Sequence, residues 1–458
     1  MGHLEREEAL AAARGIVERS AADETEVAIE SESERFVRFA DSGPTQSADR
    51  GRQRVAIRAR LRTADGWSEG KATCDGLGEA QTAAALARAL ELARVAAPDP
   101  DLLSLEGAFE GMESVGGDTI DAATTTHPFE AKAAWVKEAL DSCGASGLVP
   151  AGLASTSATA HTLVNSAGRA VHDARSRASL ALTASAPGFV TGAGFADQIT
   201  QRVDELDAES VFRRAIEKAR GSNEARSIDP GEYAVVLEPN AVSSILLFAG
   251  YMGFGAQEVA EEASFLCGRI GKELFPAALH IADDAGNDVY TGLAFDGEGT
   301  PKQRVDLLHG GALTGPVTDA HWANKLGCAN TGHALAKPNT EGPKAQNLVV
   351  AGGSQSAEQL IAGVDRGLLV TQFHYTNLID PRELLLTGMT RNGTFLIEGG
   401  EVVGAVKNLR FTDSLVNALG RVSGIGAERE VAGALFSGEV VTPALRIDGF
   451  RFTSTSDF

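Results

Sequence analysis

Histidine and cysteine side chains in the second half of the chain are the residues best suited to metal chemistry. His321, Cys328 and His333 are close in sequence, and imidazole and thiolate are the usual zinc ligands. Their spacing, six residues and then four, matches no recognised zinc site. His309 and His374 stand apart from them. Histidines scattered in this way usually serve as structural hydrogen-bonding groups, so we predict no metal bound by this chain.

Carboxylates gather in two short segments. Residues 257–262 (QEVAEE) carry three of them, a pattern more typical of a solvated helix face than of a cage for a hard cation. Residues 295–299 (FDGEG) place Asp296 and Glu298 beside glycines, which permit a tight turn near a ligand backbone. The simplest interpretation of this second segment is an acidic turn. The alternative is that Asp296 or Glu298 positions a peptide or supports a dimer interface.

One arginine has the chemistry to hold a carboxylate. Residues 390–393 (TRNG) predict a β-hairpin turn, because Asn-Gly between apolar runs is a strong hairpin signal. Arg391 lies in this predicted turn, and its guanidinium can bind a carboxylate through two hydrogen bonds. Arg391 is therefore a candidate clamp for the terminus of a peptide substrate.

Several catalytic signatures are absent from the sequence. It contains no GxxxxGK[ST], no complete GxGxxG, no GxSxG and no HExxH. Residues 352–354 (GGS) lack the x-Gly that would complete a nucleophile elbow. The sequence therefore predicts no phosphate-binding loop, no nucleophilic serine and no zincin helix.

The elements that would position these residues follow from apolar periodicity. Residues 4–20 and 80–97 are predicted helices, and residues 54–61 alternate as a half-buried strand does. The order of elements in residues 37–95 reappears in residues 163–220, with a helix at its end. We therefore predict two related α/β units in the N-terminal half.

The fold class predicted from this pattern is α+β, with a strand-and-helix N-terminal region followed by a mainly antiparallel β domain. Asp-, Gly-, Thr- and Pro-rich residues 96–128, and then residues 221–231, separate the parts. The predicted boundaries are 1–110 for the N-terminal α/β unit, 125–225 for the central α/β unit and 230–458 for the β-rich domain. Strands within the last are predicted at residues 347–351, 367–371, 393–398 and 401–406.

Charge and cysteine content limit the partners and the compartment. The formal net charge of −21 argues against a nucleic-acid-binding surface, which needs a basic footprint. The four cysteines stand far apart without a CxxC pair, so a reducing cytoplasm is the expected location. The charged N-terminus does not resemble a signal peptide, and no apolar run reaches the roughly 20 residues of a membrane span.

Several separated motifs carry a resemblance that covers nearly the whole chain. They lie at residues 235–239 (VVLEP), 264–271 (SFLCGRIG), 283–286 (DDAG), 294–301 (AFDGEGTP), 330–334 (NTGHA) and 386–401 (LTGMTRNGTFLIEGGE). This set resembles the PmbA/TldD family of metallopeptidases. The resemblance implies an α/β region, a β-rich C-terminal domain and a dimer joined through the C-terminal domains. It also makes His333, within one of the motifs, a candidate for contact with a peptide.

The chain departs from the catalytic members of that family at the zinc site. In those members a helix carries His-Glu-x-x-x-His, and a cysteine near the C-terminus is the third ligand. Counting back from residues 264–271, the motif falls on residues 247–252 (LFAGYM), so Leu247, Phe248 and Met252 occupy the positions of the first His, the Glu and the second His. None of these is a plausible zinc ligand. Residues 432–458 contain no cysteine.

The resemblance is therefore greatest to the PmbA (TldE) type of subunit, which lacks the zinc motif. The expected role is a non-catalytic subunit of a metallopeptidase complex that degrades or trims unfolded or short peptides. Zinc would be bound by a TldD-like catalytic partner and not by this chain, and a homodimer could form without that partner. An edge strand of the C-terminal domain is a candidate to hold an extended peptide by strand addition.

Two alternatives remain open from the sequence. The chain could be an active hydrolase that uses unrecognised residues, such as the carboxylates of residues 258–262 or His333. It could instead be a peptide-binding regulatory protein without a peptidase partner, since the family has been described as modulating DNA gyrase. The acidic net charge disfavours direct contact with DNA.

Overall fold

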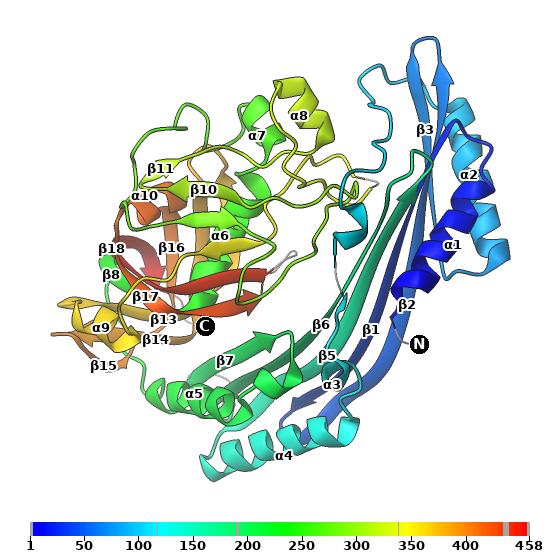
Figure 1. The fold of residues 1–458 in the computed structure, drawn as a ribbon. Helices are drawn as coiled ribbons and strands as arrows, with labels where there is room; N and C mark the ends of the chain where they lie inside the picture. Colours follow the sequence, from blue (N-terminus) through cyan, green and yellow to red (C-terminus); the bar gives the residue numbers. More distant parts are fainter. Residues whose placement is uncertain (1–2, 117, 189–191, 338, 434–438, 456–458) are drawn as a thin grey trace.

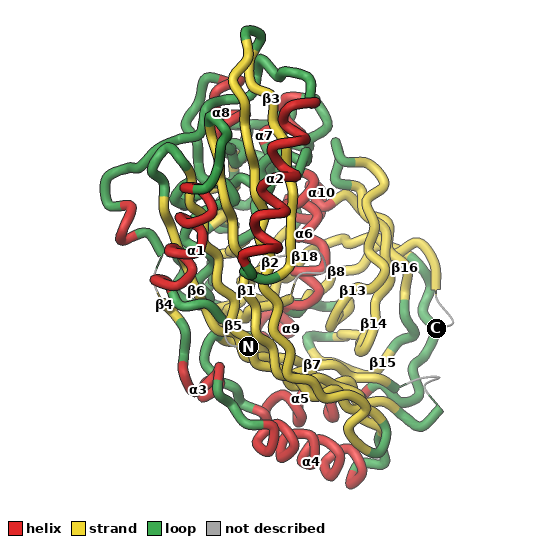
Figure 2. Tube along the Cα trace, turned by 90° about the vertical axis from the view of Figure 1, so that its right-hand side faces the viewer, coloured by secondary structure: helices red, strands yellow, loops and turns green. Residues whose placement is uncertain are grey.

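A computed structural model describes residues 3–116, 118–188, 192–337, 339–433 and 439–455. The N-terminal half forms one long sheet with helices along one side, and the C-terminal half packs beside it as a separate β-rich body (Figure 1). The view turned by 90° shows the long strands of the first sheet running the length of the molecule (Figure 2). The predicted α+β architecture is confirmed.

Two groups of elements with the same order make the N-terminal half. The first comprises α1 (Arg6–Glu18), β1 (Glu24–Ala40), β2 (Gly43–Thr63), β3 (Gly66–Asp75) and α2 (Glu79–Val95). The second comprises α4 (Phe129–Ala145), β5 (Val149–Asn165), β6 (Ala170–Ser185), β7 (Ala193–Thr200) and α5 (Ala208–Gly221). The linker between them holds the short β4 (Asp118–Thr119) and α3 (Ala122–Thr125).

Both groups contribute to a single seven-stranded sheet. Its order is β3-β2-β1-β5-β6-β4, with β7 also paired to β6, and the antiparallel β1–β5 pair joins the two groups. Successive side chains of a strand point to opposite faces. On β1, Val27 and Ile29 pack in the core under α1 and α2, and Val37 and Phe39 pack in the core under α4 and α5. The alternate residues of β1 face the other way.

A glycine at the same place in each group lets a helix lie directly on a strand. A Cβ at Gly70 of β3 would lie 2.0 Å from the carbonyl oxygen of Ala89 in α2, and one at Gly194 of β7 would lie 2.3 Å from the carbonyl oxygen of Ala215 in α5. No side chain fits at either site without moving the helix backbone. These matching glycines extend the likeness between the two groups from element order to packing.

The close approach at Gly194 gives a testable expectation. Gly194→Val should lower the free energy of unfolding by about 1–3 kcal/mol, because overpacking here displaces α5 from β7. The control is Gly144→Ala on α4, where a Cβ has no neighbour within 4 Å. That control should gain about 0.5–1 kcal/mol from helix propensity. Urea unfolding of both variants measures the difference, and equal stabilities would contradict the packing argument.

Eleven paired strands lie in the described part of the C-terminal half. They are β8 (Gly231–Leu237), β9 (Ile281–Asp283), β10 (Val305–His309), β11 (Ala312–Leu313), β12 (Leu348–Val350), β13 (Arg366–Asp380), β14 (Leu385–Glu398), β15 (Glu401–Ala405), β16 (Leu409–Ser414), β17 (Val422–Gly433) and β18 (Glu439–Thr455). Its helices are α6 (Pro239–Met252), α7 (Ala256–Ala260), α8 (Ala320–Leu326), α9 (Ala357–Ala362) and α10 (Leu415–Gly420).

Five of these strands form a closed ring. The order β18-β16-β14-β13-β8 continues with a further β18–β8 pairing, so these strands form a ring. The pairs are antiparallel apart from β8–β13 and, outside the ring, β12–β18. Aromatic rings pack within this part of the core, with centroids 4.5 Å apart for Phe373 and Phe411 and 5.6 Å apart for Phe373 and Phe450. The mainly antiparallel domain predicted from the sequence is confirmed.

The predicted hairpin turn at residues 390–393 is wrong. These residues lie inside β14, where the pairing with β13 shifts by one residue between Val370 and Gln372. Asn392 has φ +56° and Gly393 has φ +126°, so the Asn-Gly pair supplies the backbone conformation of a β-bulge. The same left-handed preference serves tight turns and bulges, and the partner strand decides between them.

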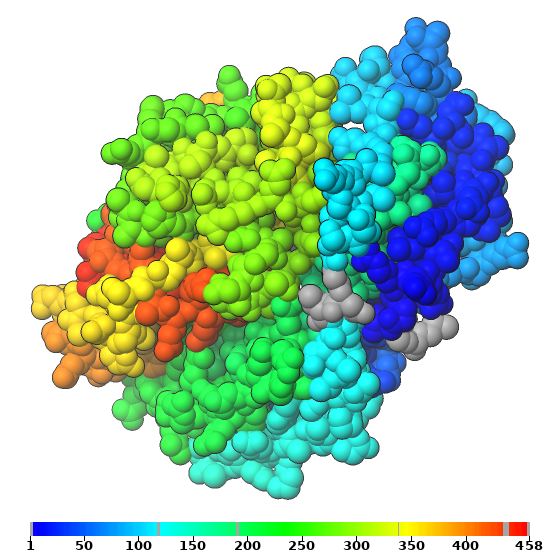
Figure 3. Space-filling model, viewed as in Figure 1, coloured from blue at the N-terminus to red at the C-terminus, as the bar shows by residue number. Residues whose placement is uncertain are grey.

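Contacts between the two halves lie along a continuous interface. Arg169, just before β6, donates to the carbonyl oxygen of Glu298 at 2.8 Å, and the amide of Ala294 donates to Asp173 of β6 at 2.9 Å. On the face drawn in space-filling form, the linker (cyan) covers part of the seam between them (Figure 3). Among the helices in the described ranges, none combines the length and the apolar character needed to cross a membrane.

Candidate functional site

Helix α6 carries the residues at the expected zinc-motif positions. Pro239 occupies the first turn, where its missing amide hydrogen is not needed, and the helix is apolar on most faces. Leu247 and Phe248 are 7% and 5% exposed, and both belong to the main core of the C-terminal half. Met252 is half-buried at the last turn. The interpretation of this segment as a core-packing helix is confirmed.

The acidic segment after α6 divides into two environments. Glu258 forms an ion pair with Lys344, whose side chain is 3% exposed, and the Lys344 ammonium lies 5.1 Å from the centre of the Tyr251 ring. Glu261 and Glu262 are exposed as expected, but they lie in the turn after α7 (Ala256–Ala260) and not on a helix face. The Glu258–Lys344 pair joins the start of α7 to the segment that packs on α6.

Asp296 is enclosed at the base of a turn. It is 4% exposed, and its carboxylate accepts hydrogen bonds from the backbone amides of Glu298, Thr300 and Ala334, each 2.9 Å long. Burial and repulsion by Glu298 outweigh these three bonds and raise the pKa of Asp296 to about 7. The carboxylate therefore joins the turn to the segment that follows α8, and it does not reach solvent as a ligand-binding group would.

The raised pKa of Asp296 predicts a pH-dependent contribution to stability. The protonated group stabilises the fold fully below its unfolded pKa near 3.8, and this contribution is lost as the pH rises through 7. Asp296→Asn also loses the acceptor for the Ala334 amide, so at pH 4 it should be less stable than the native chain by about 1–3 kcal/mol. Denaturant unfolding at several pH values should show that the difference in free energy of unfolding between the native chain and Asp296→Asn becomes smaller towards pH 7. A difference that widens with pH would refute the assignment.

His333 is buried beside Asp283 of β9, in the sheet of the C-terminal half. Its Nε2 lies 3.1 Å from Oδ1 of Asp283, and both side chains are 0% exposed. Its Nδ1 lies 2.9 Å from the hydroxyl of Thr331. Burial alone would raise the pKa of Asp283, but attraction to His333 and Lys302 and the hydrogen bond from the Asn347 amide lower it below the usual value. The imidazole joins two loops and is not presented to a ligand.

The alternative zinc ligands do not come together. Cys328 is exposed, His321 is half-buried, and His333 is enclosed with Asp283. Across the described ranges, no group of three or more His, Cys, Asp or Glu side chains is arranged to hold a metal ion. Arg391 is exposed on β14, and burial, with a smaller contribution from Arg391, lowers the pKa of His374. The described contacts of Asp296, Glu298 and His333 do not include Arg391.

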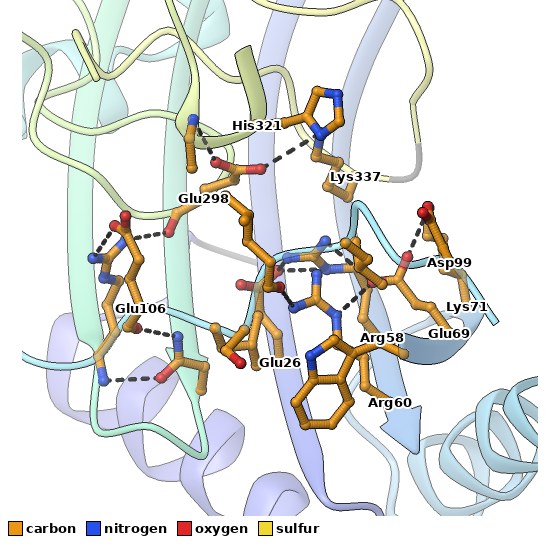
Figure 4. A pocket seen from close by; sticks show the side chains of 18 of the residues that line it. Glu26, Arg58, Arg60, Glu69, Lys71, Asp99, Glu106, Glu298, His321 and Lys337 are labelled. Atoms are coloured by element: carbon orange, nitrogen blue, oxygen red, sulfur yellow. Dashed lines mark hydrogen bonds and ion pairs between the residues drawn. The ribbon is translucent and has the colours of Figure 1, made fainter. Parts of the chain in front are cut away.

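A cavity of about 350 Å³ lies between the two halves of the molecule. One wall is the first sheet, with Glu26 of β1, Arg58 and Arg60 of β2 and Glu69 of β3 (Figure 4). The opposite wall comes from the loops of the C-terminal half, with Glu298, His321 and Lys337 (Figure 4). Of the four predicted candidates, Glu298 alone lines this cavity.

The sheet wall of the cavity is a paired network of charges. Arg58 donates through Nε to Glu26 at 2.8 Å, and Arg60 donates through Nε to Glu69 at 2.7 Å. Burial opposes the charge on Arg58, but attraction by Glu26, Glu69 and Glu298 raises its pKa. Burial would raise the pKa of Glu69, but Arg58, Arg60 and Lys71 lower it to about 2. Arg58 and Glu69 therefore stay ionised at neutral pH.

Sequence reasoning missed this wall, although a signal was present. The signal consists of two patterns. Arginines alternate with other residues in residues 54–61, and glutamates alternate with other residues in residues 24–34. The antiparallel register sets Glu24 opposite Arg60 and Glu26 opposite Arg58. Two strands with complementary alternating charges therefore predict cross-strand ion pairs.

Two matches to known domains agree with this fold and these motifs. Residues 124–223 match the PmbA/TldA metallopeptidase central domain, and residues 230–454 match the PmbA/TldA metallopeptidase C-terminal domain. The chain belongs to the PmbA/TldD metallopeptidase family. Together the two matches cover most of the chain and include α6, the Asp296 turn and His333.

Relatives of this PmbA/TldD family member agree with the assignment. Metalloprotease PmbA of Escherichia coli O157:H7 is 28% identical over 196 residues, which are 42% of this chain and 40% of that protein. The matched region thus spans less than half of that relative. Two crystal structures have the same fold: TldE from Thermococcus kodakarensis, and a protein from Thermotoga maritima described as a candidate modulator of a DNA gyrase.

The two structural matches extend over nearly the whole chain. TldE aligns with a TM-score of 0.83 and 21% identity, covering 96% of this chain and 100% of that one. The Thermotoga protein aligns with a TM-score of 0.81 and 19% identity, covering 94% and 96%. These likenesses concern the fold.

The zinc ion implied by the family does not fit the residues of α6. Its motif positions hold two buried apolar side chains and the thioether of Met252. Zinc sites in proteins use imidazole, thiolate or carboxylate ligands. The side chains at these positions of α6 therefore do not fit a zinc ion.

Proposed function

We propose that this chain is a non-catalytic subunit of a two-protein metallopeptidase that degrades or trims unfolded or short peptides. The observation that supports the proposal most directly is the chemistry of α6, where Leu247, Phe248 and Met252 stand at the positions of the family's zinc motif. In this proposal zinc and the hydrolytic step belong to a TldD-like catalytic partner in the cytoplasm. This chain completes the substrate chamber and stabilises the active complex.

The retained fold supports a structural role for α6 in that complex. A Cβ at Gly250 would lie 2.5 Å from the carbonyl oxygen of Ala345, so the segment around residue 345 rests directly on the helix. The apolar residues of α6 keep the helix packed in the core where catalytic members need polar ligands. The domain can therefore keep the shape required for assembly after the ligands are lost.

The alternative of an active hydrolase has less geometric support. Glu258 is paired with Lys344, and the ring nitrogens of His333 lie beside the buried Asp283 and the half-buried Thr331. A general base needs a free acceptor within reach of the substrate. Peptidase activity of the isolated chain that disappears in Glu258→Ala or His333→Ala, but survives in Glu261→Ala, would establish this alternative.

Native mass spectrometry with metal analysis, on tagged chain purified from its own host, tests the proposal. We expect the chain alone to be metal-free, as a monomer or homodimer, and a one-to-one complex with a second protein to carry zinc and peptidase activity. Stoichiometric zinc on the chain without a partner would refute the proposal. A chain that is recovered without any peptidase partner would favour a regulatory peptide-binding protein.

A further inference from the structure

The cavity between the two halves has the size and the chemistry of a small-ligand site. Its volume of about 350 Å³ is at the lower end of the range typical for small-molecule pockets. Such pockets are usually lined by apolar and aromatic side chains. This one has apolar lining residues too, among them Trp67, Leu102 and Leu103, but half of its lining residues are charged, five of them acidic and five basic. An apolar ligand would leave these charges without solvation.

The balance of charges limits the class of ligand further. The acidic and basic residues of the lining are equal in number, so a ligand with a net charge is not favoured over a neutral one. A neutral ligand with two opposite charges can still pair with both kinds of group. The lining therefore favours a compact zwitterion over a phosphate or a simple cation.

Unused hydrogen-bonding capacity lies on both walls. Oε1 of Glu26 accepts from both Nε and Nη2 of Arg58, at 2.8 and 2.6 Å, and the described contacts leave Oε2 without a donor. On the opposite wall, the ammonium of Lys337 lies 3.6 Å from Glu298, beyond hydrogen-bonding distance. The His321 ring contacts Trp322 edge to face, and the described hydrogen bonds do not involve it.

The unused hydrogen-bonding capacity consists of an acceptor on one wall and donors on the other, although Lys337 also forms an ion pair with Glu298 and Glu26 with Arg58. Figure 4 shows Glu26 on the sheet side and Lys337 and His321 on the opposite side of the space. Glu26 is 4% exposed and Lys337 has a side chain 16% exposed, so water competes weakly with a ligand at either group. Charge-assisted hydrogen bonds, such as a ligand would form with Glu26 or Lys337, are stronger than hydrogen bonds between neutral groups.

We propose that this cavity binds the zwitterion of an α-amino acid or a very short peptide, with its ammonium group at Glu26 and its carboxylate at Lys337 and His321. The proposal goes beyond the subunit role, because it assigns a ligand site to this chain itself. It does not depend on a catalytic partner, and the isolated full-length chain is sufficient to test it.

Isothermal titration calorimetry with three probes separates the possible ligands. The probes are L-alanine, L-alanyl-L-alanine, and the same dipeptide with an acetylated N-terminus and an amidated C-terminus. We expect saturable binding of alanine or the dipeptide, and the tighter of the two identifies the size of the natural ligand. The capped dipeptide should bind at least about tenfold more weakly, because it lacks both charges. Equal binding of the capped probe, or no binding of either zwitterion, would overturn the proposal.

Variants locate the binding to this cavity. Lys337→Met should weaken the binding of the zwitterion by about tenfold or more, because a charge-assisted hydrogen bond to its carboxylate is lost. Lys137→Met is the matched control, because Lys137 is 75% exposed on α4 outside the cavity. Circular dichroism and the unfolding midpoint show whether both variants are folded. Unchanged affinity in a folded Lys337→Met variant would contradict the assignment of the carboxylate site.

Discussion

Asp283→Ala is expected to lower the free energy of unfolding by about 2–5 kcal/mol, because it leaves the buried Nε2 of His333 and the buried amide of Asn347 without the carboxylate that faces them. Asp283 and His333 are both 0% exposed, with Oδ1 and Nε2 3.1 Å apart. Asp283 also accepts a 2.9 Å hydrogen bond from the amide of Asn347, and that donor would be left buried without an acceptor. Urea unfolding near neutral pH measures the loss.

A surface aspartate on the neighbouring strand provides the control. Asp306 of β10 has a side chain 43% exposed and pairs with Arg304, which is 56% exposed. Asp306→Ala should therefore cost at most about 1 kcal/mol. A double-mutant cycle of Asp283→Ala with His333→Ala should show a coupling of at least about 1 kcal/mol. Additive losses, or an Asp283→Ala variant as stable as the control, would show that the pair is not a structural unit.

The pH dependence of this pair has a defined sign. The pKa of Asp283 lies below its usual value, because attraction to His333 and Lys302 together with its hydrogen bonds overcomes the effect of burial. A lowered pKa gives stability that is present above the unfolded value, near pH 4, and is lost as the pH falls through the folded value. The difference between the native chain and Asp283→Ala should therefore shrink in acid.

The same geometry bears on whether His333 acts in catalysis. A histidine that serves as a general base needs one ring nitrogen directed at the substrate and the other held by an orienting group. Here Thr331 lies beside Nδ1 and Asp283 lies beside Nε2, and the ring is enclosed. A stability loss in His333→Ala without any hydrolytic activity to lose is the outcome consistent with a structural histidine.

Local periodicity was sufficient to predict the elements and insufficient to predict how they meet. The helices predicted at residues 4–20 and 80–97 correspond to α1 (Arg6–Glu18) and α2 (Glu79–Val95), because apolar spacing is a local property. The hairpin predicted at Asn392 failed because a bulge and a turn use the same positive φ. The difference lies in β13, which comes before it in the chain and pairs on both sides of Asn392.

The cavity is a stronger example of packing that local sequence patterns do not predict. Glu26, Arg58, Glu298 and Lys337 are far apart in sequence, and they come together through strand register and through the docking of the two halves. Glu298 was noted because its own segment is acidic and rich in glycine. The charges that face it come from another sheet, and a single sequence does not contain the docking geometry in any local pattern.

The second large effect is expected at the sheet wall of the cavity. Arg58→Met should destabilise the fold by about 3–5 kcal/mol, because Glu26 would remain buried, at 4% exposure, without its partner. The double variant Glu26→Leu/Arg58→Met should recover most of that loss, since a buried ion pair can be replaced by apolar side chains of similar size at little cost. Thermal and urea unfolding of the single and double variants decide between these outcomes.

The same pair of strands offers a control that differs mainly in exposure. Arg50 of β2 pairs with Glu34 of β1 in the same register, but the Arg50 side chain is 67% exposed. Arg50→Met should therefore cost at most about 1 kcal/mol. Equal losses in Arg50→Met and Arg58→Met would mean that burial does not set the strength of these cross-strand pairs.

Acid unfolding tests the network through a different group. Arg58, Arg60 and Lys71 overcome the effect of burial and hold the pKa of Glu69 at about 2. The stability that Glu69 contributes is therefore present above its unfolded pKa, near 4.5, and is lost as the pH falls towards 2. Arg58→Met removes one of the three cations, so the pKa of Glu69 should rise and the loss should begin at a higher pH. A variant whose acid transition coincides with that of the native chain would show that Arg60 and Lys71 are sufficient to hold Glu69 ionised, and that Arg58 acts on Glu26 alone.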